Sequence, residues 1–151
     1  MSLKQQLVDN AIGQEIDQLY ELIKNVLIEC SKKKKLCTNI IIVYNEAQKT
    51  KIQADASKYK VDKKYDYNYN GNWKDINLSD TNIICSDTSS EVLYFVIDKF
   101  REEKISVSPD DLCELEKNDN CKSESTIKNF FKNLFETKYH KIGNYLTINI
   151  Y

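Results

Sequence analysis

Apolar residues near the start of the chain recur at steps of three and four, the spacing that places them on one face of an α-helix. The series comprises Ile12, Ile16, Leu19, Ile23, Val26 and Cys30. It predicts an amphipathic helix over residues 14–31, ended by the four lysines Lys32–Lys35. Lysines at this end of a helix interact favourably with its dipole. The alternative is that they form part of a phosphate-binding surface.

Uninterrupted apolar runs predict two strands in the first half of the chain. Asn39–Tyr44 holds three successive isoleucines and a valine, as a buried strand does, and Thr81–Cys85 is a second short strand. Between them, residues 46–59 carry apolar positions at helical spacing. These elements predict an α+β fold with the N-terminal helix on a small, mostly antiparallel sheet.

Residues 61–78 predict a β-hairpin, because Asn70-Gly71 is the dipeptide that most readily forms a tight two-residue turn. The hairpin has an unusually aromatic surface, formed by Tyr65, Tyr67, Tyr69 and Trp73. Such a surface packs against a helix, binds a protein partner or stacks on single-stranded bases. The pattern leaves all three interpretations open.

The second half begins with a capping box, Thr88 to Glu91, which predicts a helix as far as about Lys104. A short extended segment follows at Ile105–Val107. Ser108-Pro109 then combines an N-cap with proline at the first helical position, which predicts a second helix. A third helix follows from the stripe of Ile127, Phe130, Phe131, Leu134 and Phe135, and the chain ends in an alternating strand with Leu146, Ile148 and Ile150.

This order of elements resembles the winged helix-turn-helix family over residues 88–151. The segments that carry the resemblance are ISVSPDDLCEL and STIKNFFKNLFETKYHKIGNYLTINIY. The second is similar in style to the protein-docking winged helices of the middle subunit of replication protein A and its telomere-capping relatives. The resemblance implies a recognition helix and a wing that bind nucleic acid or a protein partner. The residues it assigns to that surface are Ser125, Thr126, Lys128, Asn129, Lys132, Asn133, Lys138, His140 and Lys141.

The charge pattern favours a protein partner over DNA. The net charge is −1, and among the 22 basic residues only Arg101 is an arginine, the residue on which base readout depends most. Residues 122–151 have a net charge of +3, whereas residues 80–121 have a net charge of −7. A strong nucleic-acid-binding domain usually carries a larger basic surface.

The sequence contains no catalytic motif and only three glycines, so catalytic residues and cofactors are not predicted. The five cysteines lack the close pairs of a zinc site, and no metal site is predicted. They are expected to be free thiols in a reducing compartment. The alternatives are a Cys30–Cys37 or a Cys113–Cys121 disulfide. With no signal peptide and only short apolar runs, we expect an intracellular protein, cytoplasmic or nuclear.

The sequence therefore predicts an α+β region over residues 1–87 and a winged-helix-like region over residues 88–151, either separate or sharing one core. The expected function is that of a non-enzymatic protein-interaction or assembly module, such as a subunit of a nucleic-acid-handling complex. One alternative is a winged-helix protein that binds DNA or RNA directly. A second is a small inhibitor or immunity-type protein.

Overall fold

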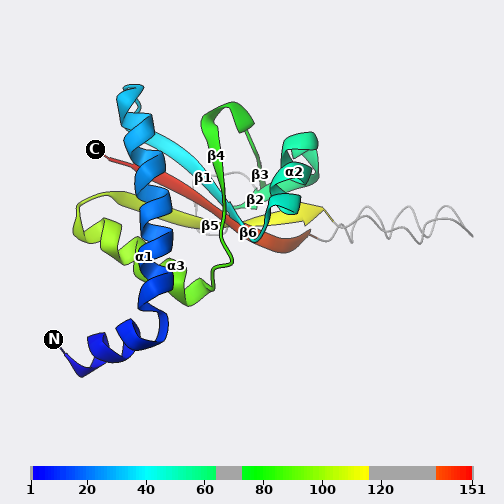
Figure 1. Ribbon diagram of the computed structural model, residues 1–151. Coiled ribbons are helices and arrows are strands. Elements are labelled where there is room, and N and C mark those ends of the chain that lie inside the picture. Colours follow the sequence, from blue (N-terminus) through cyan, green and yellow to red (C-terminus); the bar gives the residue numbers. More distant parts are fainter. Residues whose placement is uncertain (1, 64–72, 116–138, 151) are drawn as a thin grey trace, which may run out of the picture.

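The computed structural model describes residues 2–63, 73–115 and 139–150, which form an α+β fold (Figure 1). Its helices are α1 (Leu3–Lys32), α2 (Glu46–Ala54) and α3 (Ser90–Glu102). Its strands are β1 (Cys37–Val43), β2 (Tyr59–Asp62), β3 (Trp73–Asp75), β4 (Thr81–Cys85), β5 (Ser106–Leu115) and β6 (Tyr139–Asn149). The α+β part of the prediction is confirmed: a long N-terminal helix accompanies a mostly antiparallel sheet.

The six strands pair in the order β3-β2-β5-β6-β1-β4. β1 and β4 run parallel, and every other neighbouring pair is antiparallel. Strands from both predicted regions interleave, because β5 and β6 lie between β2 and β1. The two halves of the chain therefore contribute to one sheet.

Helices cover both faces of this sheet (Figure 1). On one face, α1 and α3 pack over alternate residues of the central strands, among them Ile40, Ile42 and Leu146. On the other face, Ile52 of α2 packs with Ile41 and Tyr145. The alternation follows from strand geometry, since successive side chains point to opposite faces.

α1 begins eleven residues before the predicted start and ends as predicted. Ser2 caps it by accepting a hydrogen bond from the Gln5 N–H. Buried residues begin at Ile16, and Ile16, Leu19, Ile23 and Cys30 of the predicted series are among them. Ile12 and Val26 are only partly buried. Leu3 and Leu7 in the first turns are 69% and 58% exposed, so the early part of α1 extends beyond the core.

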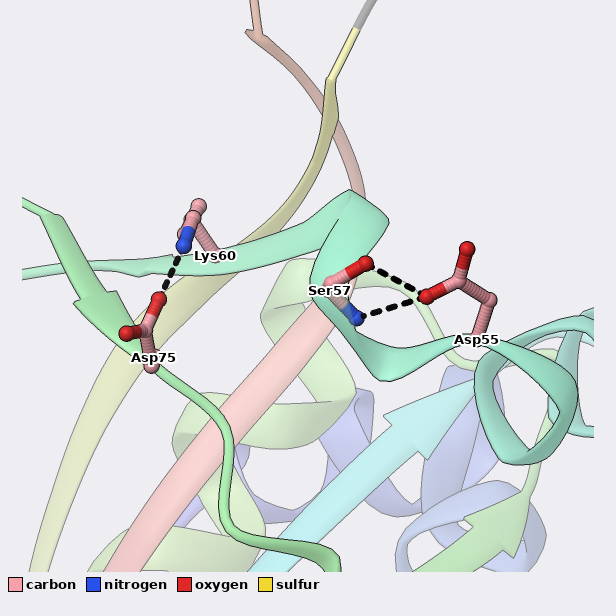
Figure 2. Close-up of polar contacts among 4 residues, drawn as sticks. All are labelled: Asp55, Ser57, Lys60 and Asp75. Atoms are coloured by element: carbon pink, nitrogen blue, oxygen red, sulfur yellow. Dashed lines mark hydrogen bonds and ion pairs between the residues drawn. The ribbon is translucent and has the colours of Figure 1, made fainter.

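α2 is shorter than predicted and is followed by a single 3₁₀ turn at Ala56–Lys58. Asp55 ends the helix and starts this turn, accepting hydrogen bonds from the backbone N–H and the hydroxyl of Ser57 (Figure 2). The turn directs the chain into β2, where Lys60 forms an ion pair with Asp75 of β3 (Figure 2). The ends of the predicted hairpin thus pair antiparallel as expected, while its Asn70-Gly71 turn lies outside the described residues.

The predicted second helix at Ser108-Pro109 is wrong: this segment is part of β5. β5 pairs with β6 along its whole length and buries Leu112 completely. Pro109 is tolerated because β2 pairs only with residues 111–114, which leaves Pro109 in a part of β5 with a strand on one side. Without this helix, the described residues give the winged-helix resemblance no support; the predicted third helix lies outside them.

α3 confirms the predicted helix, but its cap is one residue further along. The Ser89 hydroxyl, rather than that of Thr88, accepts the hydrogen bond from the Val92 N–H at 3.3 Å. The buried face comprises Val92, Leu93, Val96, Ile97 and Phe100.

Candidate interaction surface

Most of the residues predicted to bind a partner lie outside the described part of the chain. These are Ser125, Thr126, Lys128, Asn129, Lys132, Asn133 and Lys138, together with Tyr65, Tyr67 and Tyr69. The structure places the other three: Trp73 in β3, and His140 and Lys141 in β6. It separates the last two, because His140 pairs across from Glu114 and Lys141 across from Cys113, on opposite faces of the sheet.

The strand register places Trp73 on the same face of the sheet as α1 and α3. Trp73 pairs directly with Asp62, Asp62 with Asp111, and Asp111 with Asn144. Asn144 in turn pairs with Ile42, which packs beneath these helices. Directly paired residues point to the same face, so this row runs from the helix-covered core to the β3 edge.

Trp73 contacts the ring of Tyr139 from the far end of β6. The ring centroids are 4.1 Å apart with an interplanar angle of 31°. Their strands are separated in the sheet by β2 and β5, and neighbouring strands lie about 4.8 Å apart. The two side chains therefore meet across the intervening strands. Trp73 nevertheless remains 38% exposed.

An ion pair lies on the same face of the sheet as these rings. Lys141 Nζ is 3.1 Å from the Asp111 carboxylate, and both side chains are partly exposed. Asp62, the direct neighbour of both Trp73 and Asp111, is buried. We call the group of Trp73, Tyr139, Asp111 and Lys141 the aromatic face.

A hollow of about 710 Å³ adjoins the aromatic face where α3 meets the sheet. Asp62, Asp111 and Lys141 line its sheet side, while Tyr94 and Arg101 of α3 line the other. Tyr94 is 64% exposed. The Arg101 guanidinium donates a hydrogen bond to the Val107 carbonyl at 2.9 Å. This arginine joins α3 to β5.

The opposite face of the sheet carries a second charged cluster, around Tyr145. Lys63 and Asp110 form an ion pair of 2.9 Å, and their side chains are only 12% and 8% exposed. Lys63 Nζ also lies 5.8 Å from the centre of the Tyr145 ring, and Lys74 Nζ lies 6.0 Å from it. Burial, reinforced by the carboxylates of Asp110 and Asp80, raises the pKa of Tyr145, although a hydrogen bond with Thr81 opposes this.

Sequence reasoning missed Lys63 and Asp110 because they lie 47 positions apart. Asp110 directly follows Ser108-Pro109, the predicted helix start, where a carboxylate interacts favourably with the helix dipole without a partner. Only the pairing of β2 with β5 brings these residues together, and no local signal in the sequence encodes that pairing.

The cysteine prediction is confirmed for Cys30, Cys37 and Cys85, which are free thiols; the Cys30–Cys37 disulfide is absent. Burial, together with a hydrogen bond to Glu46, raises the pKa of the Cys85 thiol. Nowhere in the described ranges do three or more His, Cys, Asp or Glu side chains gather as metal ligands would. Within the same ranges, no helix combines the length and apolar content needed to cross a bilayer.

No protein-family model, curated protein or solved structure matches the chain. Its function must therefore be inferred from its own residues.

Proposed function

We propose that the chain is a non-enzymatic protein-interaction module that docks a partner on the aromatic face. The observation that carries this proposal is the Trp73–Tyr139 ring contact, which leaves a tryptophan 38% exposed at the β3 edge of the sheet. Tryptophan and tyrosine are enriched where proteins bind one another, and tryptophan is prominent among residues whose truncation costs most affinity.

The surroundings of Trp73 suit a docking surface. Tyr139 already restricts the indole ring, so little conformational entropy remains to be lost on binding. Asp111 and Lys141 supply polar contacts of both signs at its margin, as the rim of an interface does. The adjoining hollow of about 710 Å³ offers space for a side chain of the partner.

Site-specific photocrosslinking in cells that express the protein tests this proposal. A photoreactive phenylalanine analogue at position 73 is expected to give a discrete crosslinked product. The same analogue at Tyr44, an aromatic residue 55% exposed just after β1, is the matched control and is expected to give none. The product at position 73 should also disappear on Lys141→Glu. Equal crosslinking at the two positions, or none at position 73, would contradict the proposal.

The only tryptophan in the chain is Trp73. Once the crosslinked partner is identified and purified, its binding should therefore shift the intrinsic tryptophan emission. Tyr139→Ala removes the stacked ring and is expected to weaken binding about tenfold or more, because aromatic anchors of this kind commonly contribute over 1.4 kcal/mol. Tyr44→Ala should leave the affinity unchanged.

Direct nucleic-acid binding is the second candidate, favoured by the arrangement at the end of α1. Lys32–Lys35 are all exposed, and Lys33 and Lys35 line a hollow of about 350 Å³ together with Thr38 and Asn82. Cations beside hydroxyl and amide groups suit phosphate oxygens.

Fluorescence anisotropy of labelled single- and double-stranded oligonucleotides distinguishes this candidate from the first. It predicts binding whose log affinity for duplex falls by about 0.9 per phosphate neutralised, for each tenfold rise in salt. Replacing Lys33 and Lys35 by glutamine should abolish such binding and leave the crosslink at position 73 intact. Absence of binding at low salt would exclude the second candidate.

A further inference from the structure

The two edge strands of the sheet differ in how they are protected against pairing with another chain. β3 ends one side with three residues, and two of them, Lys74 and Asp75, are charged. Short length and charge are the usual means by which an exposed edge avoids pairing with other chains. β4 ends the other side with the sequence Thr-Asn-Ile-Ile-Cys, which contains no charge and no proline. Of the two edges that the described strands form, only β4 carries no charge.

The side chains of β4 are also incompletely covered. All five are half-buried, although the facing residues of β1 are buried almost throughout. Ile84 packs toward the core under α1 and α3, while Ile83 and Cys85 pack toward the core under α2. A further strand beside β4 would therefore bury apolar surface on both faces of the sheet.

The hydrogen bonds to β1 identify which backbone groups of β4 point outward. The Ser86 N–H donates to the Val43 carbonyl at 2.8 Å. Because alternate residues of a strand direct their N–H and C=O groups to the same side, Asn82 and Ile84 also face β1. Thr81, Ile83 and Cys85 consequently face away from it. The Thr81 N–H is already bonded to the Leu78 carbonyl, so the outward groups are centred on Ile83.

We propose that two copies of the chain pair through β4, antiparallel about a two-fold axis at Ile83, and join their sheets into one. In this register Ile83 pairs with Ile83 of the other copy, and Thr81 pairs with Cys85. Each Ile83 N–H donates to the opposite Ile83 carbonyl, and each Cys85 N–H donates to the opposite Thr81 carbonyl. The occupied Thr81 N–H is not needed. Such an isologous contact closes at two subunits.

The outward backbone groups favour a second copy as the occupant. Because the Thr81 N–H is bonded to the Leu78 carbonyl, the outward donors of β4 are the N–H groups of Ile83 and Cys85. An antiparallel copy centred on Ile83 presents the same two donors and the carbonyls of Ile83 and Thr81 opposite them. β4 carries no charge, so no like charges within the two strands oppose the pairing.

This interface lies at the opposite end of the sheet from β3 and Trp73, so it is independent of the proposed docking surface. Sedimentation velocity over a range of concentrations tests it without any partner. The full chain is expected to form a species of twice the monomer mass of 17.7 kDa. A protein that stays monomeric at every concentration up to about 1 mM would overturn the proposal. Its dissociation constant would then exceed about 1 mM, far weaker than that of specific dimers.

Ile83→Pro removes the central outward donor while sparing the hydrogen bonds to β1, and Ile83→Val is the matched control that keeps it. Two lost bonds, one in each copy, should weaken dimerisation roughly 30-fold in Ile83→Pro. Ile83→Val should dimerise almost normally. A dimer unaffected by Ile83→Pro in a protein with a native circular dichroism spectrum would overturn the proposed register.

Disulfide trapping tests the contact itself and keeps the test decisive if Ile83→Pro fails to fold. In a Cys37→Ser background, Thr81→Cys should form a disulfide with Cys85 of the other copy on mild oxidation. Lys74→Cys, on the β3 edge, should not. Equal crosslinking at both edges, or none at position 81, would overturn the proposal.

Discussion

Gly143 of β6 pairs with Val43 of β1 and packs closely against its backbone. A Cβ atom added to it would stand 2.3 Å from the backbone carbonyl oxygen of Ile42, which cannot move without disturbing the strand pairing. We expect Gly143→Ala to lower the free energy of unfolding by about 1–3 kcal/mol, the usual cost of overpacking. Urea titration followed by circular dichroism measures this loss.

Gly13 provides the matched control for that measurement. It lies within α1, and an added Cβ would be 3.6 Å from the nearest atom, an ordinary contact. Alanine is the better helix former, so Gly13→Ala should raise the free energy of unfolding by about 0.5–1 kcal/mol. If both variants raise the free energy of unfolding, the close contact with the Ile42 carbonyl does not exclude a side chain at position 143.

The adjacent residues Asp110 and Asp111 allow a second comparison at this scale. Asp110→Asn would leave the Lys63 ammonium buried without its carboxylate, and the expected loss of stability is about 3 kcal/mol. Asp111→Asn breaks a partly exposed pair with Lys141, and the expected loss is under about 1 kcal/mol. Thermal unfolding of both variants checks the difference. Similar losses of stability in the two variants would show that another group compensates the buried charge of Lys63.

At the scale of elements, the sequence and the structure identify different N-cap residues for α3. The capping box predicted Thr88 as the cap, but the Ser89 hydroxyl accepts the hydrogen bond. Ser89→Ala should therefore destabilise the protein by about 1 kcal/mol. Thr88→Ala should cost less, since it removes only a side-chain contact with Ser86. Urea unfolding ranks the two variants. A larger loss of stability in Thr88→Ala than in Ser89→Ala would support Thr88 as the N-cap.

The elements predicted correctly are those whose signals are local. The helical spacing from Ile16 to Cys30 sufficed for α1, and the run of isoleucines at positions 40–42 sufficed for β1. The part of β5 that follows Val107 was mistaken for a helix because Ser108-Pro109 is a strong local signal for a helix start. The pairing of β5 with residues 139–149 outweighs that signal. Single residues of the candidate site, such as Trp73 and Lys141, were identified, but their grouping depends on the same long-range pairing.

At the scale of the whole molecule, the interleaved strand order determines which fragments can fold. β1 and β2 are never neighbours, because β6 and β5 lie between them. A fragment of residues 1–87 therefore contains both outer parts of the sheet without its centre. It would expose Ile40, Ile41 and Ile42 of β1, which are at most 3% exposed in the intact chain.

We therefore expect the fragment of residues 1–87 to show no cooperative unfolding when it is produced alone. Cutting the chain between Asp87 and Thr88 breaks no described strand or helix, so mixing the fragments 1–87 and 88–151 should restore the sheet. Circular dichroism during urea titration measures cooperativity, and Trp73 emission reports recovery of its stacking on Tyr139. Because that contact joins the two fragments, its recovery requires that they reassemble. A cooperative transition in the isolated fragment would instead show that residues 1–87 form a core of their own. The complete sheet would then form by association of two regions that fold separately.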